Sequence, residues 1–206
     1  TQFNPRLAAL AGGKFVALYG DASSNDGSGY GVFAKVFNAD GSVAVAEQVV
    51  PTTVAGNQYG HDVAVLADGG YVVVWWSADD QIHGQRFDAT GVRAGSEFQV
   101  SSADSVPYQD YARVTALADG GFVVAWDSYN GVGANTYDVF IQQFDAAGNK
   151  VDGPIVANAS NASTQYLPDI AALTGSNFVV AWASYNQEAE TASTYGVFTR
   201  MFGTPG

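Results

Sequence analysis

The sequence has 206 residues, 47% of them hydrophobic, and a formal net charge of −12 from eight basic and twenty acidic side chains. A polyphosphate needs a basic surface, so nucleic acid is not expected as a partner, and an anionic membrane surface is disfavoured for the same reason. Cysteine is absent, which excludes disulfides and thiolate chemistry, and no apolar run is long enough for membrane insertion.

One pattern occurs four times along the chain, and the copies span 1–56, 57–107, 108–163 and 164–206. Each copy carries a leucine, then a turn that usually contains glycine, then an aromatic residue; the leucines are Leu10, Leu66, Leu117 and Leu173. A glutamine precedes each leucine at a fixed distance. Repeats of about 50 residues that hold several short strands are typical of β-propeller blades.

The elements follow in the same order in each repeat. The first repeat predicts an innermost strand at 6–10, a long loop at 20–31 and an outer strand at 47–50. The second predicts strands at 62–66, 71–75 and 97–100, with the tight turn Asp68-Gly69-Gly70 between the first two. The third predicts strands at 113–117, 139–144 and 154–157, and the fourth at 169–173, 178–182 and 197–202. The sequence therefore predicts an all-β, four-bladed β-propeller.

The fourth repeat has no predicted outer strand, because only 203–206 follow its third strand and they are rich in Gly and Pro. An unpaired strand edge can pair with another chain. We therefore expect this edge to be open and to offer a route to a homo-oligomer.

The sequence motifs of the repeats resemble those of repeats in large secreted bacterial proteins of the RTX-adhesin type. The resemblance rests on Leu-Ala-Asp-Gly-Gly-Phe-Val-Val-Ala-Trp at 117–126, on Gln-x-Phe-Asp-Ala-x-Gly at 142–148 and on Glu-Phe-x-Val at 97–100. It implies a secreted or cell-surface protein of bacterial origin. The calcium-binding nonapeptide of that class is absent, so its calcium chemistry is not implied.

Propeller topology places the irregular loops and the glutamine-bearing connections at one end of the blades, where binding residues usually lie. Tyrosine suits carbohydrate recognition because it combines a flat apolar face with a hydroxyl. The predicted ligand-binding residues at this end are Tyr30, Tyr59, Asp127, Tyr129, Tyr137, Tyr166, Tyr185 and Tyr195.

A second candidate is a set of alternating charges at the start of the innermost strands. Its members are Arg6, Asp62, Arg113 and Asp169. They would either form a polar mouth that holds an ion or small ligand, or neutralise one another as ion pairs.

Asp21, Asn25 and Asp26 lie in a glycine-rich loop and supply the hard oxygen ligands that Ca²⁺ accepts. Their spacing is not that of an EF-hand, and the other three loops do not repeat it. Calcium is the one cofactor that the sequence suggests.

Catalytic motifs are absent: the chain has two histidines, no nucleophile elbow and no metalloprotease or phosphate-binding motif. We therefore expect a protein that is not an enzyme but an extracellular, glycan-binding or adhesive module, with a glycan or another cell-surface component as partner. A purely structural or protein-binding propeller is the alternative. A secreted glycosidase is third, because carboxylate pairs such as Asp79-Asp80 can hydrolyse glycosides.

Overall fold

The computed structural model describes residues 1–23, 25–101, 109–129, 136–159, 164–185 and 195–203, which form four antiparallel sheets. The first contains β1 (Gln2–Ala9), β2 (Phe15–Asp21), β3 (Gly31–Phe37) and β4 (Val43–Val49), with a short 3-10 helix (Ala11–Gly13) after β1. The second contains β5 (Gln58–Val65), β6 (Tyr71–Ser77), β7 (Gln81–Phe87) and β8 (Phe98–Gln99). The third contains β9 (Gln109–Ala116), β10 (Phe122–Tyr129), β11 (Tyr137–Phe144) and β12 (Lys150–Val156). The fourth contains β13 (Gln165–Ala172), β14 (Phe178–Tyr185) and β15 (Tyr195–Phe202).

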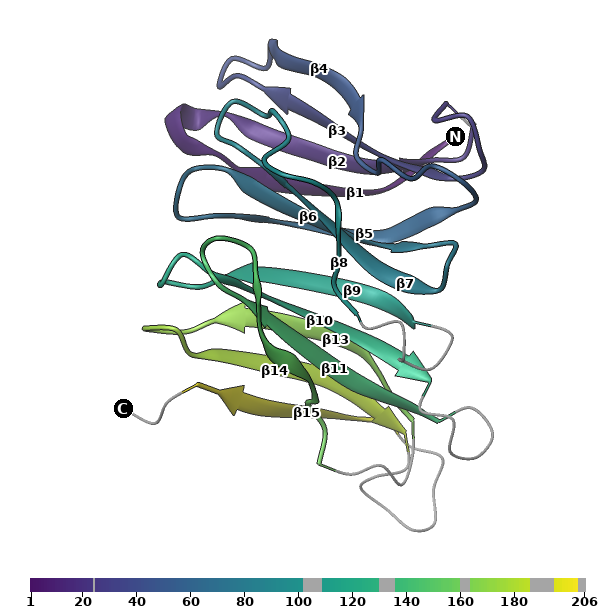
Figure 1. Ribbon diagram of the computed structural model, residues 1–206, viewed down its shortest axis with the longest axis vertical. Helices are drawn as coiled ribbons and strands as arrows, with labels where there is room; N and C mark the ends of the chain where they lie inside the picture. The colour runs from purple at the N-terminus through teal and green to yellow at the C-terminus, as the bar shows by residue number, and fades with distance from the viewer. Residues whose placement is uncertain (24, 102–108, 130–135, 160–163, 186–194, 204–206) are drawn as a thin grey trace.

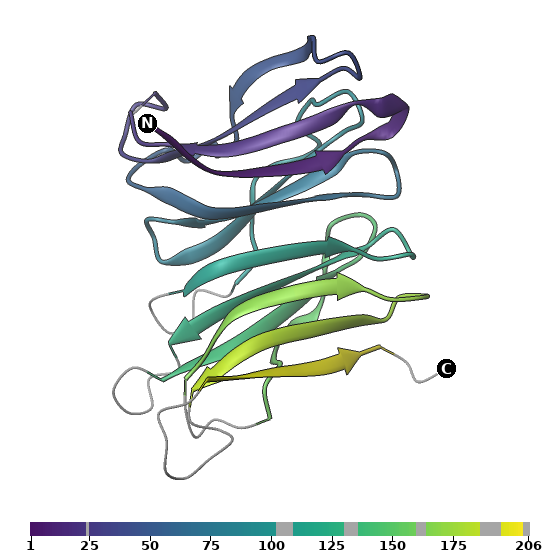
Figure 2. The ribbon, with the colours of Figure 1, turned by 180° about the vertical axis from the view of Figure 1, so that it is seen from behind.

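This arrangement confirms the predicted all-β, propeller-like fold with one sheet for each repeat. The expectation that the fourth sheet lacks an outer strand holds for the residues that the structure describes. Successive sheets lie side by side through their first strands, β1 beside β5, β5 beside β9 and β9 beside β13. Figures 1 and 2 show the four sheets in a row along the long axis, with the first and the last at opposite ends. Within the described ranges, no helix is long and apolar enough to cross a membrane.

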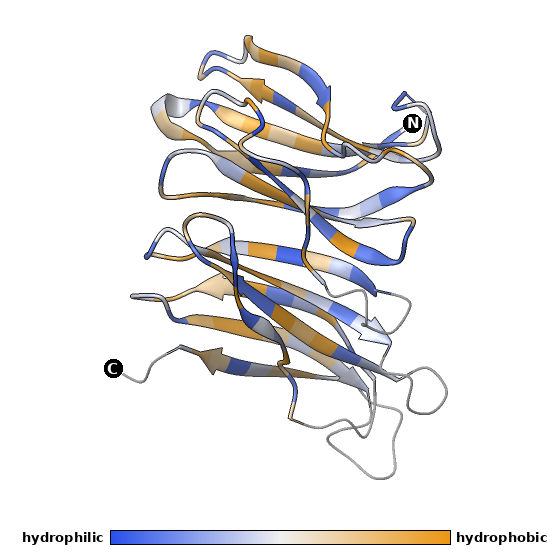
Figure 3. Cartoon of the chain, in the orientation of Figure 1, coloured by the Kyte–Doolittle hydropathy of each residue, from blue (hydrophilic) through white to orange (hydrophobic). Residues whose placement is uncertain are grey.

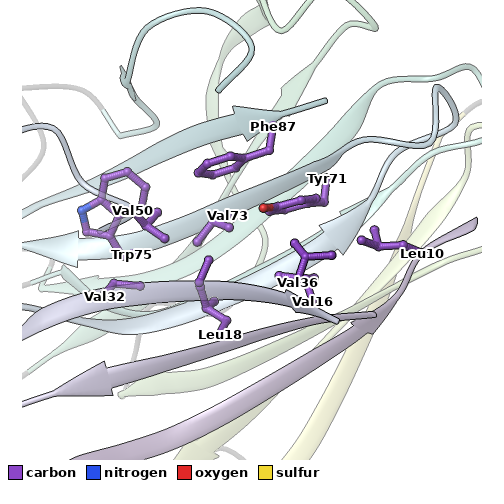
Figure 4. Close-up of a cluster of buried hydrophobic side chains, with 11 residues drawn as sticks. Leu10, Val16, Leu18, Val32, Val36, Val50, Tyr71, Val73, Trp75 and Phe87 are labelled. Atoms are coloured by element: carbon purple, nitrogen blue, oxygen red, sulfur yellow. The ribbon is translucent and has the colours of Figure 1, made fainter. Parts of the chain in front are cut away.

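The core consists of three hydrophobic layers, one between each pair of successive sheets. In the first layer, Tyr71, Val73 and Trp75 of β6 pack against Val16 and Leu18 of β2 (Figure 4). The strands β6 and β10 are buried on both faces, which explains their continuous apolar sequences. Figure 3 shows strongly hydrophobic stretches on strands of all four sheets.

The innermost strands differ from the prediction at their beginnings. They start at the repeated glutamines, and a β-bulge interrupts each of them before the predicted first residue. One residue at each bulge has a positive φ: Asn4 (48°), Gly60 (64°), Tyr111 (50°) and Leu167 (52°). The bulge allows the strand to continue, so that four segments expected to be loops are paired backbone.

Polar contacts join neighbouring sheets where the innermost strands begin. The Arg6 guanidinium lies 3.7 Å from the Asp62 carboxylate, and the backbone N–H of Val114 donates to Asp62 Oδ2 at 3.0 Å. His61 Nε2 lies 2.8 Å from the Asn4 carbonyl oxygen, and burial lowers the pKa of His61 to about 4. The neutral ring therefore donates this hydrogen bond between the first two sheets at neutral pH.

Candidate functional site

A cavity of about 530 Å³ opens at the loop-rich end of the second, third and fourth sheets. Its lining comes from the starts of β5, β9, β11, β13 and β15 and the ends of β6, β10 and β14. The lining residues are Tyr59, Trp76, Asp80, Gln109, Asp110, Tyr111, Asp127, Tyr137, Thr164, Tyr166, Tyr185 and Tyr195. Topology alone predicts these strand ends to meet, and the cavity lies there.

Aromatic rings contribute both sides of the cavity. On the second sheet, Tyr59 and Trp76 pack together with ring centroids 4.4 Å apart and planes tilted by 30°. On the fourth, Tyr195 lies against Tyr185 at 5.0 Å and against Tyr166 at 6.0 Å. Flat apolar rings facing one cavity suit the faces of sugar rings or other flat ligands.

Two carboxylates lie between these aromatic groups, on the third sheet. Asp110 of β9 and Asp127 of β10 are directly opposite one another in the strand register, so their side chains are neighbours on one face. The corresponding pairs in the other sheets are Phe3 with Gly20, Tyr59 with Trp76 and Tyr166 with Ala183. The third repeat alone has two acids here, although like charges directly opposite one another destabilise a sheet.

The environment of this pair favours its protonated form. Asp127 is only 2% exposed, and burial, together with the nearby charge of Asp110, raises its pKa to about 7. Leu167 opposes this shift because its backbone N–H donates to Asp127 Oδ2 at 3.0 Å. Burial also raises the pKa of Asp110, while Arg113 moderates both shifts through its charge.

Gln109 adds an unused polar group to the cavity. The side chain is 2% exposed, and among the described residues neither its amide nitrogen nor its oxygen has a hydrogen-bond partner. The same glutamine in two other repeats is engaged: Gln58 donates to the carbonyls of Ala55 and Gly56, and Gln165 accepts from the Trp182 indole at 3.1 Å. The repeated glutamine thus holds neighbouring groups in the second and fourth repeats, and Gln109 makes no such contact with the described residues.

Six of the predicted ligand-binding residues line this cavity, namely Tyr59, Asp127, Tyr137, Tyr166, Tyr185 and Tyr195. Tyr129 lies beside it, with its ring 5.8 Å from that of Tyr137. Tyr30 lies on the first sheet, where it packs edge-on against Phe3, away from the cavity lining.

Three of the alternating charges lie close together, since the charges of Arg113 and Arg6 both oppose the burial that raises the pKa of Asp62. Arg6 and Asp62 form the ion pair expected of them. Arg113 instead donates to the Ala112 carbonyl at 2.9 Å, and the Asp169 carboxylate accepts from the Ile170 N–H at 3.0 Å. None of the four lines the cavity, and the described contacts that join neighbouring sheets are those of Arg6 and Asp62.

Most carboxylate oxygens of the loop proposed for calcium accept hydrogen bonds within the loop, whereas Asp26 Oδ2 is buried without a partner among the described residues. Asp21 accepts hydrogen bonds from Ser23 and from Asn25 Nδ2, and it also lies 3.7 Å from the chain's amino group. Asp26 Oδ1 accepts from the Ser28 N–H at 3.1 Å. The described part of the chain holds no group of three or more His, Cys, Asp or Glu that could bind a metal.

Sequence reasoning missed five of the lining residues, Trp76, Gln109, Asp110, Tyr111 and Thr164, and named Asp80 only as half of a carboxylate pair. The pair Asp79-Asp80 is also divided, since Asp79 accepts from His83 at 2.9 Å and Asp80 faces the cavity. Alignment of the repeats at their glutamines carried the missing signal. It places Asp110 at the position of Phe3, Tyr59 and Tyr166.

No family model matches the sequence, and no curated protein matches it either. Solved structures do match the fold. A GH43 endo-arabinanase from Bacillus licheniformis is 16% identical, with a TM-score of 0.54 over 97% of this chain and 73% of that one. An α-L-arabinanase from Penicillium chrysogenum, complexed with arabinobiose, is 11% identical, with a TM-score of 0.68 over 99% of this chain and 63% of that one.

A microbial sialidase, Hz136, is also 11% identical, with a TM-score of 0.65 over 97% of this chain and 44% of its own. The chain thus shares the propeller fold of several carbohydrate-active enzymes while spanning only part of their length. At these identities the likeness establishes the fold alone. The resemblance to RTX-type adhesins finds no support in these matches.

Proposed function

We propose that this protein binds carbohydrate in the cavity between its second, third and fourth sheets, in keeping with an extracellular role. The proposal rests on one observation: the four repeats carry different residues at the strand positions that face the cavity. The scaffold positions that face the cavity hold aromatic rings on two sheets and two acids on the sheet between them. Aromatic faces for sugar rings and carboxylates for hydroxyl groups are the groups that a sugar site needs.

The test is a direct binding measurement with a matched pair of variants. Tyr195 is exposed and lines the cavity, whereas Tyr30 is exposed on the first sheet outside it. A glycan array that includes arabino-oligosaccharides identifies a ligand, and calorimetry then measures its affinity. We expect Tyr195→Ala to weaken binding about tenfold, as the loss of one ring contact would, and Tyr30→Ala to leave it unchanged. Equal effects of the two substitutions, or binding to no glycan, would contradict the proposal.

Glycoside hydrolysis is a second candidate, and the pair Asp110 and Asp127 favours it. An acid with a pKa of about 7 holds a proton near neutral pH and can donate it to a leaving oxygen, while an ionised neighbour assists the attacking water. Incubation of the protein with arabinan oligosaccharides and with nitrophenyl glycosides decides the matter. Turnover that Asp127→Asn abolishes, with ligand binding retained, would establish the enzyme. Binding without turnover by the unaltered protein would leave a binding module.

A further inference from the structure

The charged groups that line the cavity are all acidic. Asp80 comes from the turn between β6 and β7, Asp110 from β9 and Asp127 from β10. No Lys, Arg or His belongs to the described lining. The nearest base, Arg113, acts on both acids only through its charge, and it forms no ion pair with either of them among the described contacts. A carboxylated or sulfated sugar would therefore meet repulsion here.

Asp110 is the acid placed to meet a ligand. It is more exposed than Asp127, which is buried and already accepts the Leu167 N–H. Asp110 lies beside Gly60 of the neighbouring strand, where a β-carbon would come within 3.2 Å of its Oδ1 oxygen. The same oxygen accepts a hydrogen bond from the N–H of Tyr111 at 2.8 Å. Both neighbours are at Oδ1, and Oδ2 has no hydrogen bond among the described contacts.

The surrounding rings favour a positive charge as well. The face of an aromatic ring attracts a cation, and a desolvated site strengthens this attraction. Tyr59 and Trp76 lie beside Asp110 in the cavity lining. Burial raises the pKa of Tyr59, and the charges of Asp110 and Asp80 raise it further. The amide of Gln109, which is buried and has no partner among the described residues, is an independent polar group that a ligand in the cavity could use.

We propose that the cavity prefers a sugar that carries a protonated amine, with the ammonium group held by Asp110 beside the paired rings of Tyr59 and Trp76. The amide of Gln109 is left to bind a neighbouring hydroxyl. This inference rests on the proposed carbohydrate site and names its ligand class. It follows from the negative charge of the lining, because a site for neutral sugars does not require charged residues.

The experiment compares three small ligands at pH 6.5 by calorimetry with the whole chain. They are the glucosamine disaccharide, its N-acetylated counterpart, which has the same rings without the charge, and N-acetyl-lysine amide, which has the amine without the sugar. A hydrogen bond to a charged group corresponds to a preference of about tenfold or more for the amine-bearing disaccharide. Asp110→Asn should remove that preference. Asp119→Asn, in the turn at the other end of the same sheet, should keep it, which separates a local contact from the general attraction of an acidic protein.

Each other result has a definite meaning. Equal binding of both disaccharides, unchanged by Asp110→Asn, would overturn the inference and leave the carbohydrate site standing. If N-acetyl-lysine amide binds as tightly as the glucosamine disaccharide, the sugar contributes nothing to the affinity, and both proposals are overturned. Failure of both disaccharides to bind, while another glycan binds in the cavity, would overturn the inference alone.

Discussion

Asp127 lies in the candidate site, and its ionised form lowers the stability of the fold because the side chain is buried. An acid of this kind ordinarily has a pKa near 3.8, and in the folded chain it is raised to about 7. Between these values the folded state keeps a proton that the unfolded state has lost. Stability contributed by the protonated form is therefore present at low pH and is lost as the pH rises through 7.

Asp127→Asn should remove this cost, because the neutral amide can still accept the Leu167 N–H. We expect the variant to exceed the parent in free energy of unfolding by about 1 to 3 kcal/mol at pH 8, since one pKa unit corresponds to about 1.4 kcal/mol. The difference should shrink towards pH 4. Urea unfolding at pH 4, 6 and 8, with Asp119→Asn as control, measures it. A variant less stable than the parent at pH 8 would mean that the ionised Asp127 is stabilised in the fold.

Single site residues could be predicted where the residue type and its place in the repeat both indicate a role. Asp127 was found because it begins the irregular segment 127–138, which was expected at the loop-rich end of the blades. Asp110 was missed because the strand was expected to begin at Arg113. The bulge that extends this strand has Tyr111 at a positive φ, and tyrosine gives no sign of that conformation. Gly60 does, but in a different repeat.

The repeats predicted the elements better than the propensities of single residues did. Four copies of one pattern fixed the number of sheets, the order of strands within them and the end at which the cavity lies. Strand ends were less predictable, since pairing with a neighbour decides them. The outer strand of the second sheet is reduced to Phe98–Gln99, whereas that of the first extends over Val43–Val49.

Local hydrogen bonds explain why some conspicuous loop acids are not in the site. Asp40, Asp88 and Asp145 each begin or line a turn and accept hydrogen bonds from Ser42, Thr90 and Asn149 respectively. These bonds lower the pKa of all three carboxyl groups. Turn acids of this kind recur at the regular end of the sheets. An acid that interrupts a recurring aromatic position, as Asp110 does, is a better guide to function.

At the scale of the whole molecule, the two end sheets each leave one face uncovered. Strand β14 alternates between buried and half-buried residues, whereas β10 in the third sheet is buried almost throughout. The free face of the last sheet carries Val197 and Met201, which are 77% and 70% exposed, opposite Ala183 and Val179. The sequence of β14 is nevertheless as apolar as that of β10, so this face has the composition of an interface.

The free face of the first sheet has the complementary composition. Phe15 stacks on Phe37, and Tyr19 on Phe33, on the side of the sheet opposite to the first core layer. Within the chain, the equivalent aromatic rings of each following sheet pack on the aliphatic face of the sheet before it, as Tyr71 and Trp75 do on Val16 and Leu18. The aromatic face of a second copy is therefore suited to the aliphatic face of the last sheet.

We expect the protein to associate head to tail with a second copy as its concentration rises. Replacement of both Val197 and Met201 by Lys should abolish this association, because two ammonium groups would be buried without partners in an apolar contact. Val92→Lys is the control: Val92 is also apolar and exposed, but it lies in a turn of the second sheet. Sedimentation velocity over a concentration series, with melting curves to verify folding, measures the effect. Association that persists in the double variant would point instead to the unpaired edge of β15, and a monomer at every concentration would show that neither surface binds a second copy.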